Sequence, residues 1–320
     1  MPHWRKLGRV FDPMAVHDRP WLKEFAQAPS ALICGDVVRI YFSCRPPADA
    51  AGQYVSHSAY VDLDRADLFT IRAVAEAPIL PLGQTGAFDE FGVYPVSVIR
   101  HGDEVRAYYA GWTRCESVPF NTAIGCAVSR DGGIRFERLG PGPILPYGPD
   151  EPFVMSGPKV RIFGGVWYLF YIAGRSWKMH GGRAEPVYRI RMATSPDGLT
   201  WTKAGRDLIP PRIEPDEAQA SPDVFFAGGR YHMHFCYRYS TDYRGHERGY
   251  RIGYAWSDDL VTWTRADERA GLDVSAEGWD AQMVSYPHVF AVDGRTYLAY
   301  LGNDVGRGGF GLAVLDGPMG

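Results

Sequence analysis

Hydrophobic and polar positions follow one pattern that recurs five times along this chain. Each copy opens at a residue–proline pair, alternates apolar and polar positions up to a turn with glycine or aspartate, and returns through a run rich in tyrosine and phenylalanine. The opening prolines are Pro29, Pro95, Pro158, Pro222 and Pro287, a period of about 65 residues. Alternation on both sides of a tight turn predicts a β-hairpin in each copy.

A second hairpin is predicted to follow the first in each period. Residues 123–140, 190–205 and 251–267 each contain a strand, a Ser-x-Asp turn and another strand with tryptophan or phenylalanine, and residues 58–74 form a degenerate copy. The Ser-x-Asp turns are expected to close by side chain to backbone hydrogen bonds, away from any site. Four consecutive strands per period are typical of a β-propeller blade.

The two ends of the chain together supply the last blade. Residues 310–314 match a third strand that no fourth strand follows, whereas residues 4–9 repeat the spacing of residues 201–206. We therefore predict an all-β fold: a five-bladed β-propeller with four-stranded blades, closed by the N-terminal strand, as a single domain over residues 1–320. Such closure removes open sheet edges. A two-sheet sandwich would explain the alternation, but neither the period nor the matching ends.

Composition and charge narrow the possible functions. The 320 residues are 46% hydrophobic and 14% aromatic, which excludes collagen, coiled coil and helix bundle. The net charge of −3 provides no basic field, so neither nucleic acid nor a membrane is an expected partner. There is no apolar run long enough to span a membrane and no recognisable signal peptide, so a cytoplasmic location is expected. Five cysteines without a CxxC pair, and histidines without ligand spacing, predict reduced thiols, no metal and no cofactor.

The five short blades, the X-Pro openings and the segment SPDGLTW at residues 195–201 resemble the five-bladed glycosidase-type propellers. These include glycoside hydrolase families 43, 32 and 68 and the family-130 mannoside phosphorylases. The resemblance covers essentially the whole chain, and the C-terminal third looks like uncharacterised members found among polysaccharide-biosynthesis proteins. It implies this fold and a carbohydrate ligand, while the reaction depends on the site.

The resemblance also implies three carboxylates at the inner ends of the first three blades, and this sequence departs at all three. In the family-43 pattern they are an Asp before proline acting as base, a second Asp that tunes pKa, and a Glu before Gly-Pro acting as acid. Ala28, Tyr94 and Ser156 stand in those places. Because Ala cannot take a proton and Ser cannot replace a Glu acid at neutral pH, the usual mechanism does not transfer residue for residue.

Other carboxylates lie in the loops that lead into the inner strands, and these loops are expected to border the central funnel. One interpretation is that catalysis has moved to this shell. The catalytic candidates are then Glu90, Glu151, Glu217 and Asp89, with Asp280 as a substrate-binding residue. The alternative is that these side chains cap loops, pair with arginines or face water.

Basic residues end the second inner strand of four blades. They are Arg45, Arg114, Arg175 and Arg238, with Asn303 at the equivalent place in the fifth blade. Because a hairpin returns to its starting edge, these ends are expected on the same rim as the acidic loops. The guanidinium fork matches carboxylate or phosphate, which indicates a sugar phosphate, a nucleotide sugar or an acidic sugar as ligand. The alternative is that each arginine pairs with a neighbouring acid and fixes the rim.

Aromatic side chains near this rim are the remaining candidates. Tyr94, Trp112 and Tyr286 are predicted to stack on sugar rings. Aromatic residues inside the strands, such as Tyr108 and Trp167, are assigned to the core.

Three functions fit these observations. The first is a carbohydrate-active enzyme acting on a glycosidic bond of a sugar or anionic sugar derivative in the funnel, as hydrolase, phosphorylase or transglycosylase. Arginines fit a phosphorylase, because phosphate replaces water as nucleophile and only one proton donor is needed. The second is a carbohydrate-binding propeller without catalysis, which the three replaced carboxylates support. The third is another reaction on an anionic sugar-like metabolite.

Overall fold

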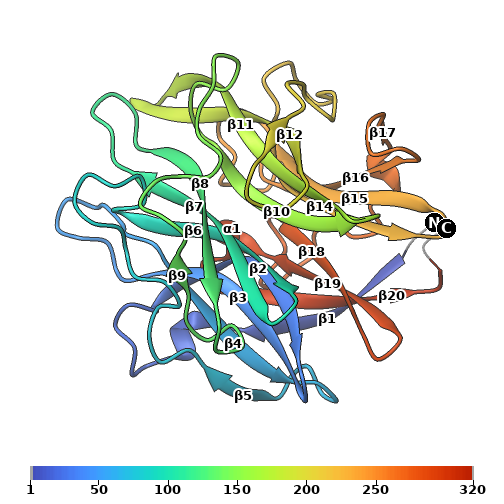
Figure 1. Ribbon diagram of the computed structural model, residues 1–320. Helices are drawn as coiled ribbons and strands as arrows, with labels where there is room; N and C mark the ends of the chain where they lie inside the picture. Colours follow the sequence, from blue (N-terminus) through green and yellow to red (C-terminus); the bar gives the residue numbers. More distant parts are fainter. Residues whose placement is uncertain (1–2, 319–320) are drawn as a thin grey trace.

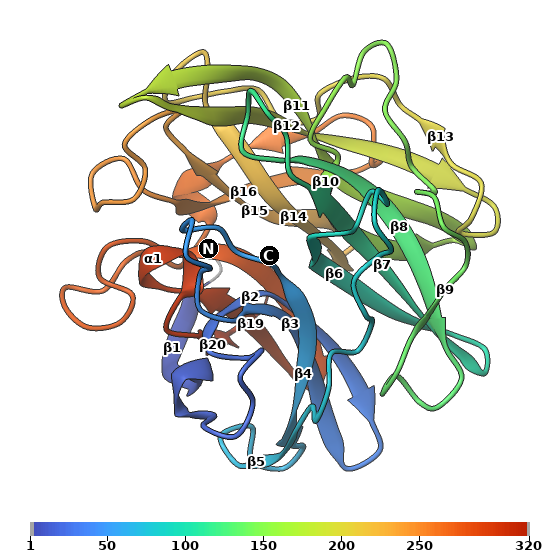
Figure 2. The same cartoon turned by 90° about the vertical axis from the view of Figure 1, so that its left-hand side faces the viewer.

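Five four-stranded antiparallel sheets surround a common centre in this chain, of which the computed structural model describes residues 3–318 (Figure 1, Figure 2). The first four sheets each use four consecutive strands, and the last takes the first strand of the chain as its outermost member. The predicted all-β, five-bladed β-propeller is confirmed.

Within each blade the strands are given from the centre outwards. They are β2 (Glu24–Cys34), β3 (Val37–Arg45), β4 (His57–Asp64) and β5 (Ile71–Val74) in blade 1; β6 (Gly92–His101), β7 (Glu104–Thr113), β8 (Asn121–Ser129) and β9 (Glu137–Arg138) in blade 2; β10 (Ser156–Phe163), β11 (Val166–His180), β12 (Arg183–Ser195) and β13 (Thr202–Lys203) in blade 3; β14 (Ala218–Ala227), β15 (Arg230–Arg238), β16 (Arg251–Ser257) and β17 (Thr264–Arg265) in blade 4; and β18 (Ser285–Val292), β19 (Arg295–Leu301), β20 (Phe310–Asp316) and β1 (His3–Phe11) in blade 5. Short helical turns are η1 (Pro13–Ala15), η2 (Asp267–Arg269) and α1 (Asn303–Gly306). None of the helices described has the length and hydrophobicity needed to cross a bilayer.

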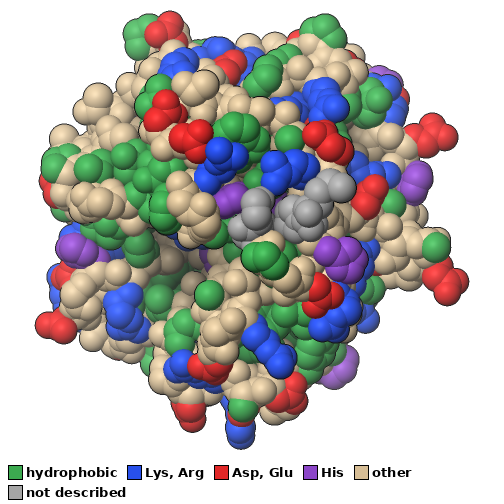
Figure 3. All heavy atoms as spheres, turned by 90° about the vertical axis from the view of Figure 1, so that its right-hand side faces the viewer, with side chains coloured by type: hydrophobic (Ala, Val, Ile, Leu, Met, Phe, Trp, Pro, Cys, Tyr) green, Lys and Arg blue, Asp and Glu red, His purple; other side chains and the backbone are tan. Residues whose placement is uncertain are grey.

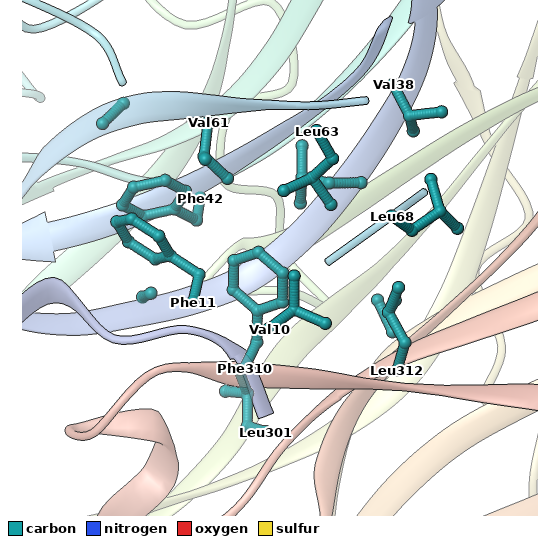
Figure 4. Packing of buried hydrophobic residues seen from close by; sticks show 14 of the residues in the cluster. Val10, Phe11, Val38, Phe42, Val61, Leu63, Leu68, Leu301, Phe310 and Leu312 are labelled. Carbon is teal, nitrogen blue, oxygen red and sulfur yellow. The ribbon is translucent and has the colours of Figure 1, made fainter. Parts of the chain in front are cut away.

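The N-terminal strand closes the ring as predicted. Strand β1 pairs antiparallel with β20, from His3 opposite Asp316 to Phe11 opposite Phe310. The rings of Phe11 and Phe42 then meet at 4.9 Å between centroids, and those of Phe11 and Phe310 at 5.8 Å (Figure 4). The closing strand is therefore fastened to its own blade by backbone hydrogen bonds and to blade 1 by buried aromatic packing.

Every innermost strand is interrupted at its X-Pro pair by a shift in register with the next strand. The shifts fall between Gln27 and Ser30, Val93 and Val96, Ser156 and Lys159, Ala220 and Asp223, and Ser285 and His288. In four blades the residue before the proline has positive φ, including Ala28 at 54° and Tyr286 at 51°; in the remaining blade the Tyr94–Pro95 peptide is cis. Such bulges re-aim the side chains on either side of them.

In four of the five blades, a side chain one or two residues after the proline accepts a hydrogen bond from a backbone amide of the next blade's inner strand. The amide–acceptor pairs are Val98 to Ser30 Oγ (3.1 Å), Val160 to Ser97 Oγ (3.1 Å), Val289 to Asp223 Oδ2 (2.6 Å) and Ala31 to His288 Nε2 (2.9 Å). All four acceptors are buried. We call this set the inter-blade ring.

The fifth position of the ring is Lys159, which has no acceptor atom. Its buried ammonium donates instead to the Pro29 carbonyl at 3.1 Å, and Arg161 links blades 3 and 4 through the Asp223 carboxylate at 2.6 Å. Burial lowers the pKa of Lys159 to about 8 and that of His288 to about 4. A neutral His288 can accept the Ala31 amide through Nε2, with its proton on Nδ1 facing Asp223 at 3.3 Å.

The polar segment after Arg175 is not a loop: β11 and β12 continue as paired strands to His180 opposite Arg183. Gly181 and Gly182 form the connection with φ of 55° and 77°, the geometry of a two-residue hairpin turn. The sequence does not predict this extension. Because the arm formed by the ends of β11 and β12 stands out from the blade, its residues do not alternate between apolar and polar.

The aromatic contact that closes the ring is testable by truncation. Phe11→Ala is expected to lower the free energy of unfolding by about 3–5 kcal/mol, since a fully buried ring is lost and a cavity remains. Urea denaturation of the purified protein measures this change. Phe226→Ala removes the same group from a side chain that is 54% exposed and should change stability far less. Equal losses in the two variants would contradict the assigned role of Phe11.

Candidate functional site

A central cavity of about 580 Å³ is lined by residues from all five blades. Inner-strand residues next to the bulges contribute Gln27, Tyr94, Ser156 and Tyr286 to its lining. The remaining lining comes from strand ends and connections, including the tip of the β11–β12 arm and the α1 segment. Figure 3 shows the face of the molecule opposite to the one in Figure 2. On this face basic and acidic side chains are interspersed, and no region carries charge of one sign alone.

The cavity is rich in arginine and poor in carboxylate. Its arginines are Arg45, Arg114, Arg183, Arg238, Arg244 and Arg307. Among the described residues that line it, only Glu185 and Asp304 carry carboxylates. The lining therefore has an excess of positive charge, and how each arginine is already bonded determines what it can offer a ligand.

Arg45 is a lining arginine without an acidic partner among the described residues. Its Nε donates to Ser56 Oγ at 3.1 Å and its Nη2 to Gln27 Oε1 at 3.4 Å. Its guanidinium lies over the rings of Phe25 and Tyr54, at 4.6 and 5.3 Å. Within residues 3–318 it makes no ion pair, so its charge is available to an anion.

Arg114 lies on the same side of the cavity. Its Nη2 donates to the Tyr54 carbonyl at 3.1 Å and lies 3.5 Å from the exposed carboxylate of Asp49. Its buried Nε has no hydrogen-bond partner within the described chain. A buried donor left unsatisfied is costly, and a ligand oxygen would satisfy it.

Arg238 is held too tightly to offer donors. It is 1% exposed, and its guanidinium bonds the hydroxyls of Tyr188 and Tyr250 and three carbonyl oxygens while lying 3.6 Å over the ring of Tyr243. It therefore orders the tyrosines of the cavity wall.

Arg175 does not reach the cavity, contrary to expectation. Arg175 is the extra residue of a bulge between Gly174 and Ser176. Its side chain points outwards, and its Nη2 forms an ion pair with Asp207 Oδ2 at 2.9 Å. The sequence placed it at a strand end, whereas the strand continues.

Three lining arginines were missed from the sequence because Arg244 and Arg307 lie in connections without a repeated pattern and Arg183 begins the strand extension that the sequence did not predict. Arg244 and Arg183 approach Glu185 at 2.8 and 3.6 Å, and Arg307 pairs with Glu24 at 2.7 Å. Tyr243 also donates to Glu185, at 2.5 Å. Burial would raise the pKa of Glu185, but the bonds from Arg244 and Tyr243 outweigh it and lower that pKa.

Four of the proposed acidic residues lie inside their blades and not in the cavity. Each is buried and bonded to a basic residue of the outermost strand of its own blade. The pairs are Asp89–Arg138 (2.7 Å), Glu151–Lys203 (2.6 Å), Glu217–Arg265 (2.6 Å) and Asp280–Lys6 (2.6 Å). Three of the acids also accept from a second-strand tyrosine: Asp89 from Tyr109, Glu151 from Tyr171 and Asp280 from Tyr300.

This placement corrects the expectation that these loops present carboxylates to the funnel. A buried carboxylate requires a partner, and the base at the end of the outer strand provides one within the same blade. Glu90 also lies outside the cavity lining and accepts from the Gly86 amide at 2.9 Å. The alternative interpretation, pairing with arginines, is correct for Asp89, Glu151 and Glu217, whereas Asp280 pairs with Lys6.

The remaining candidates divide in the same way. Tyr94, Trp112 and Tyr286 line the cavity, and the hydroxyls of Tyr94 and Tyr286 lie 3.0 Å apart, joining blades 2 and 5. Asn303 is absent from the lining and bonds the Gln282 amide and the Gly278 carbonyl. The next residue, Asp304, lines the cavity instead. Ligand binding by the lining residues stays a prediction.

Within residues 3–318, no three or more His, Cys, Asp or Glu side chains are grouped so that they could hold a metal ion. His232 and His234, which alternate on one strand face, are instead buried and bonded to Tyr254 and to the Ala270 carbonyl.

Comparison with known proteins gives the family of this protein. No family model matches it. The uncharacterized protein Rv1502 of Mycobacterium tuberculosis is 37% identical over 314 residues, which cover 98% of this chain and 99% of that protein. This protein belongs to the Rv1502 family. The 1,2-beta-oligomannan phosphorylase of Thermoanaerobacter sp. is 27% identical over 195 residues, 60% of this chain and 57% of that enzyme.

Solved structures similar to this Rv1502-family member share its fold at low sequence identity. The BT0996 RGII complex has a TM-score of 0.73 at 18% identity and covers 99% of this chain and 92% of that one. A thermostable family-43 glycoside hydrolase gives 0.66 at 16%, covering 92% and 89%. The beta-1,2-mannobiose phosphorylase of Listeria innocua gives 0.68 at 13%, covering 99% and 97%. The resemblance to these five-bladed propellers is thus confirmed for the fold.

The buried acid–base pairs predict a pH-dependent stability. Burial would raise the pKa of Glu151, but bonds from Lys203, Tyr171 and Arg191 outweigh it and lower that pKa. The stabilisation is therefore present above the unfolded pKa of about 4.3 and lost as pH falls through the folded value. Glu151→Gln should lower the free energy of unfolding by about 3–5 kcal/mol at pH 7.

Urea denaturation at pH 7 and near pH 3 tests this, with Glu90→Gln as the matched control. The difference between wild type and Glu151→Gln should narrow in acid, while Glu90→Gln should stay near wild type at both values. A difference independent of pH would contradict the ion-pair assignment.

Proposed function

We propose that this member of the Rv1502 family is a carbohydrate-active enzyme that acts on a glycosidic bond in the central cavity, with phosphate as the second substrate. The observation that carries the proposal is the cavity itself. Arg45 has no acid partner there and Arg114 has an unsatisfied buried Nε, beside the aromatic side chains Tyr94, Trp112 and Tyr286. Aromatic faces suit sugar rings and guanidinium groups suit phosphate.

One sequence relative supports phosphorolysis: an oligomannan phosphorylase that matches 60% of this chain. The solved structures with the same fold include a mannobiose phosphorylase and also glycoside hydrolases, so the fold is compatible with either reaction. Hydrolysis by two carboxyls needs an acid and a base or nucleophile flanking the bond. The inner-strand places that would hold them carry Ala28, Tyr94 and Ser156.

In the proposed reaction a phosphate oxygen forms a bond to the anomeric carbon while the bond from that carbon to the glycosidic oxygen breaks. The departing oxygen takes up one proton, and hydrogen phosphate loses one. Atoms and charge balance, giving a sugar phosphate and a free hydroxyl. Arg45 and Arg114 would bind and orient the phosphate and offset its charge, so that one proton-transferring group is sufficient.

A second function, saccharide binding without turnover, is favoured by the three replaced inner-strand positions. Binding alone needs the arginines and aromatic residues but no proton donor. The two functions differ in whether a sugar phosphate accumulates.

A ligand panel tests the proposal. Thermal unfolding is followed with phosphate, sulfate, sugar 1-phosphates, nucleotide sugars, uronic acids and neutral oligosaccharides. Phosphate or a sugar phosphate should raise the melting temperature selectively over sulfate. Arg45→Gln should weaken that binding about 10–100-fold, the value of one or two charge-assisted hydrogen bonds.

Arg100→Gln is the matched control, because Arg100 is exposed on β6 outside the cavity lining. Responding oligosaccharides are then incubated with phosphate, and sugar phosphate is measured by phosphorus NMR. Binding without product supports the second function. A shift only with neutral glycans, unchanged in Arg45→Gln, contradicts the role given to the arginine.

A further inference from the structure

Resting on the function proposed above, we infer that Asp304 is the proton-transferring catalytic residue of this cavity. The assignment moves the chemistry from the inner strands to the connection between β19 and β20 in blade 5. Three observations carry it: the bonding state of the lining carboxylates, the backbone of the α1 segment, and the hydrogen bonds that join this segment to Arg45.

Asp304 is the lining carboxylate that is not already engaged. Glu185, the other one, is 4% exposed and bound by Arg244 and Tyr243 at 2.8 and 2.5 Å. Asp304 is exposed, and its side chain makes no hydrogen bond and no ion pair within 4 Å to any residue of the described chain. A proton donor must be able to change its charge during the reaction, which a carboxylate bound by a guanidinium resists.

The backbone holds Asp304 in a conformation that side chains other than glycine rarely adopt. Asp304 has φ 53° and ψ 34°, and the next residue, Val305, has φ 54° and ψ 43°. A β-branched residue in this region is an outlier, and such a backbone conformation persists only where surrounding contacts hold it. The surrounding contacts must therefore impose this geometry.

Those contacts come from blade 1 and from the segment that leads into blade 5. Gln27, buried on β2, donates through Nε2 to the Val305 carbonyl at 2.6 Å, and the Phe25 amide donates to the Arg307 carbonyl at 3.0 Å. The Val305 amide is directed at Met283 Sδ at 3.4 Å. The α1 segment is thus held at Val305 and at Arg307 by hydrogen bonds, and Asp304 directly precedes Val305.

The same glutamine connects the segment to the anion-binding arginine. Gln27 Oε1 accepts from Arg45 Nη2 at 3.4 Å while Gln27 Nε2 holds Val305. One side chain therefore positions both Arg45 and the residue after Asp304. A phosphate at Arg45 and a carboxyl at Asp304 would be oriented by one rigid group on an inner strand.

In the reaction, the Asp304 carboxyl group would transfer a proton to the glycosidic oxygen as the bond to the anomeric carbon breaks. The phosphate oxygen held by Arg45 and Arg114 forms the new bond to that carbon. The proton released from phosphate restores the Asp304 carboxyl, so the group is unchanged after one turnover. The reverse reaction uses the carboxylate as base.

Asp304→Asn tests this assignment, because asparagine keeps the shape and tolerates positive φ. Phosphorolysis of an unactivated oligosaccharide should fall about 100-fold or more, the usual contribution of a general acid. With an aryl glycoside whose leaving phenol is strongly acidic, the loss should be under ~10-fold, because that leaving group needs no proton. Asp103→Asn, an exposed aspartate in the β6–β7 turn, should match wild type on both substrates.

Phosphate affinity gives a second measurement that does not depend on turnover. Removing a negative charge beside the arginines should tighten phosphate binding about 5-fold in thermal-shift titrations. Wild type that turns over no glycoside contradicts the proposed function, and the inference that rests on it. Wild-type turnover with equal activity in Asp304→Asn, or an equal loss on both leaving groups, overturns the role of Asp304 and leaves the function standing.

Discussion

The inter-blade ring is the constraint on which the rest of the structure depends. Sheets that pack around a centre need a fixed relative placement, and here each inner strand changes register at its X-Pro pair to provide it. In four blades a side chain next to the bulge lines the cavity, and in four blades a side chain after the proline accepts from the next blade. A buried hydrogen bond to a backbone amide allows little displacement, because losing it leaves an unsatisfied donor in the interior. The size of the cavity and the positions of its lining residues follow from these junctions.

Lys159 shows how the ring tolerates a member that cannot accept. Its ammonium binds across to blade 1, while Arg161 and Asp223 make the junction between blades 3 and 4 with an ion pair. Asp223 consequently serves two blades at once, holding Arg161 through one oxygen and the Val289 amide through the other. The three charged side chains are stable at the centre because each has fixed partners there.

Charge is divided between two environments that use the same residue types. Within the blades, acids from the loops meet bases from the outermost strands and neither reaches the cavity. At the cavity of the described chain, six arginines outnumber the two carboxylates, of which Glu185 is bound by Arg244 and Tyr243 and Asp304 is not bound. This division explains why a propeller with nearly balanced net charge has a strongly basic pocket. It also means that a ligand anion would enter a site whose positive charge is already desolvated in part, where attraction is stronger than in water.

The sequence by itself determined the blade count, the two hairpins of each blade and the closure by residues 4–9, because these depend on side-chain alternation and turn residues within a few positions of one another. It also marked Arg45, Arg114, Tyr94, Trp112 and Tyr286 as cavity candidates, since strand ends have a fixed place in a repeated blade. Only the tertiary structure decided that Asp89, Glu151, Glu217 and Asp280 turn into their blades, that Arg175 faces outwards and that Asp304 enters the cavity. Those outcomes depend on which partner lies within bonding distance in the folded blade, such as Lys6 for Asp280, and contacts between residues dozens to hundreds of positions apart leave no local pattern in the sequence.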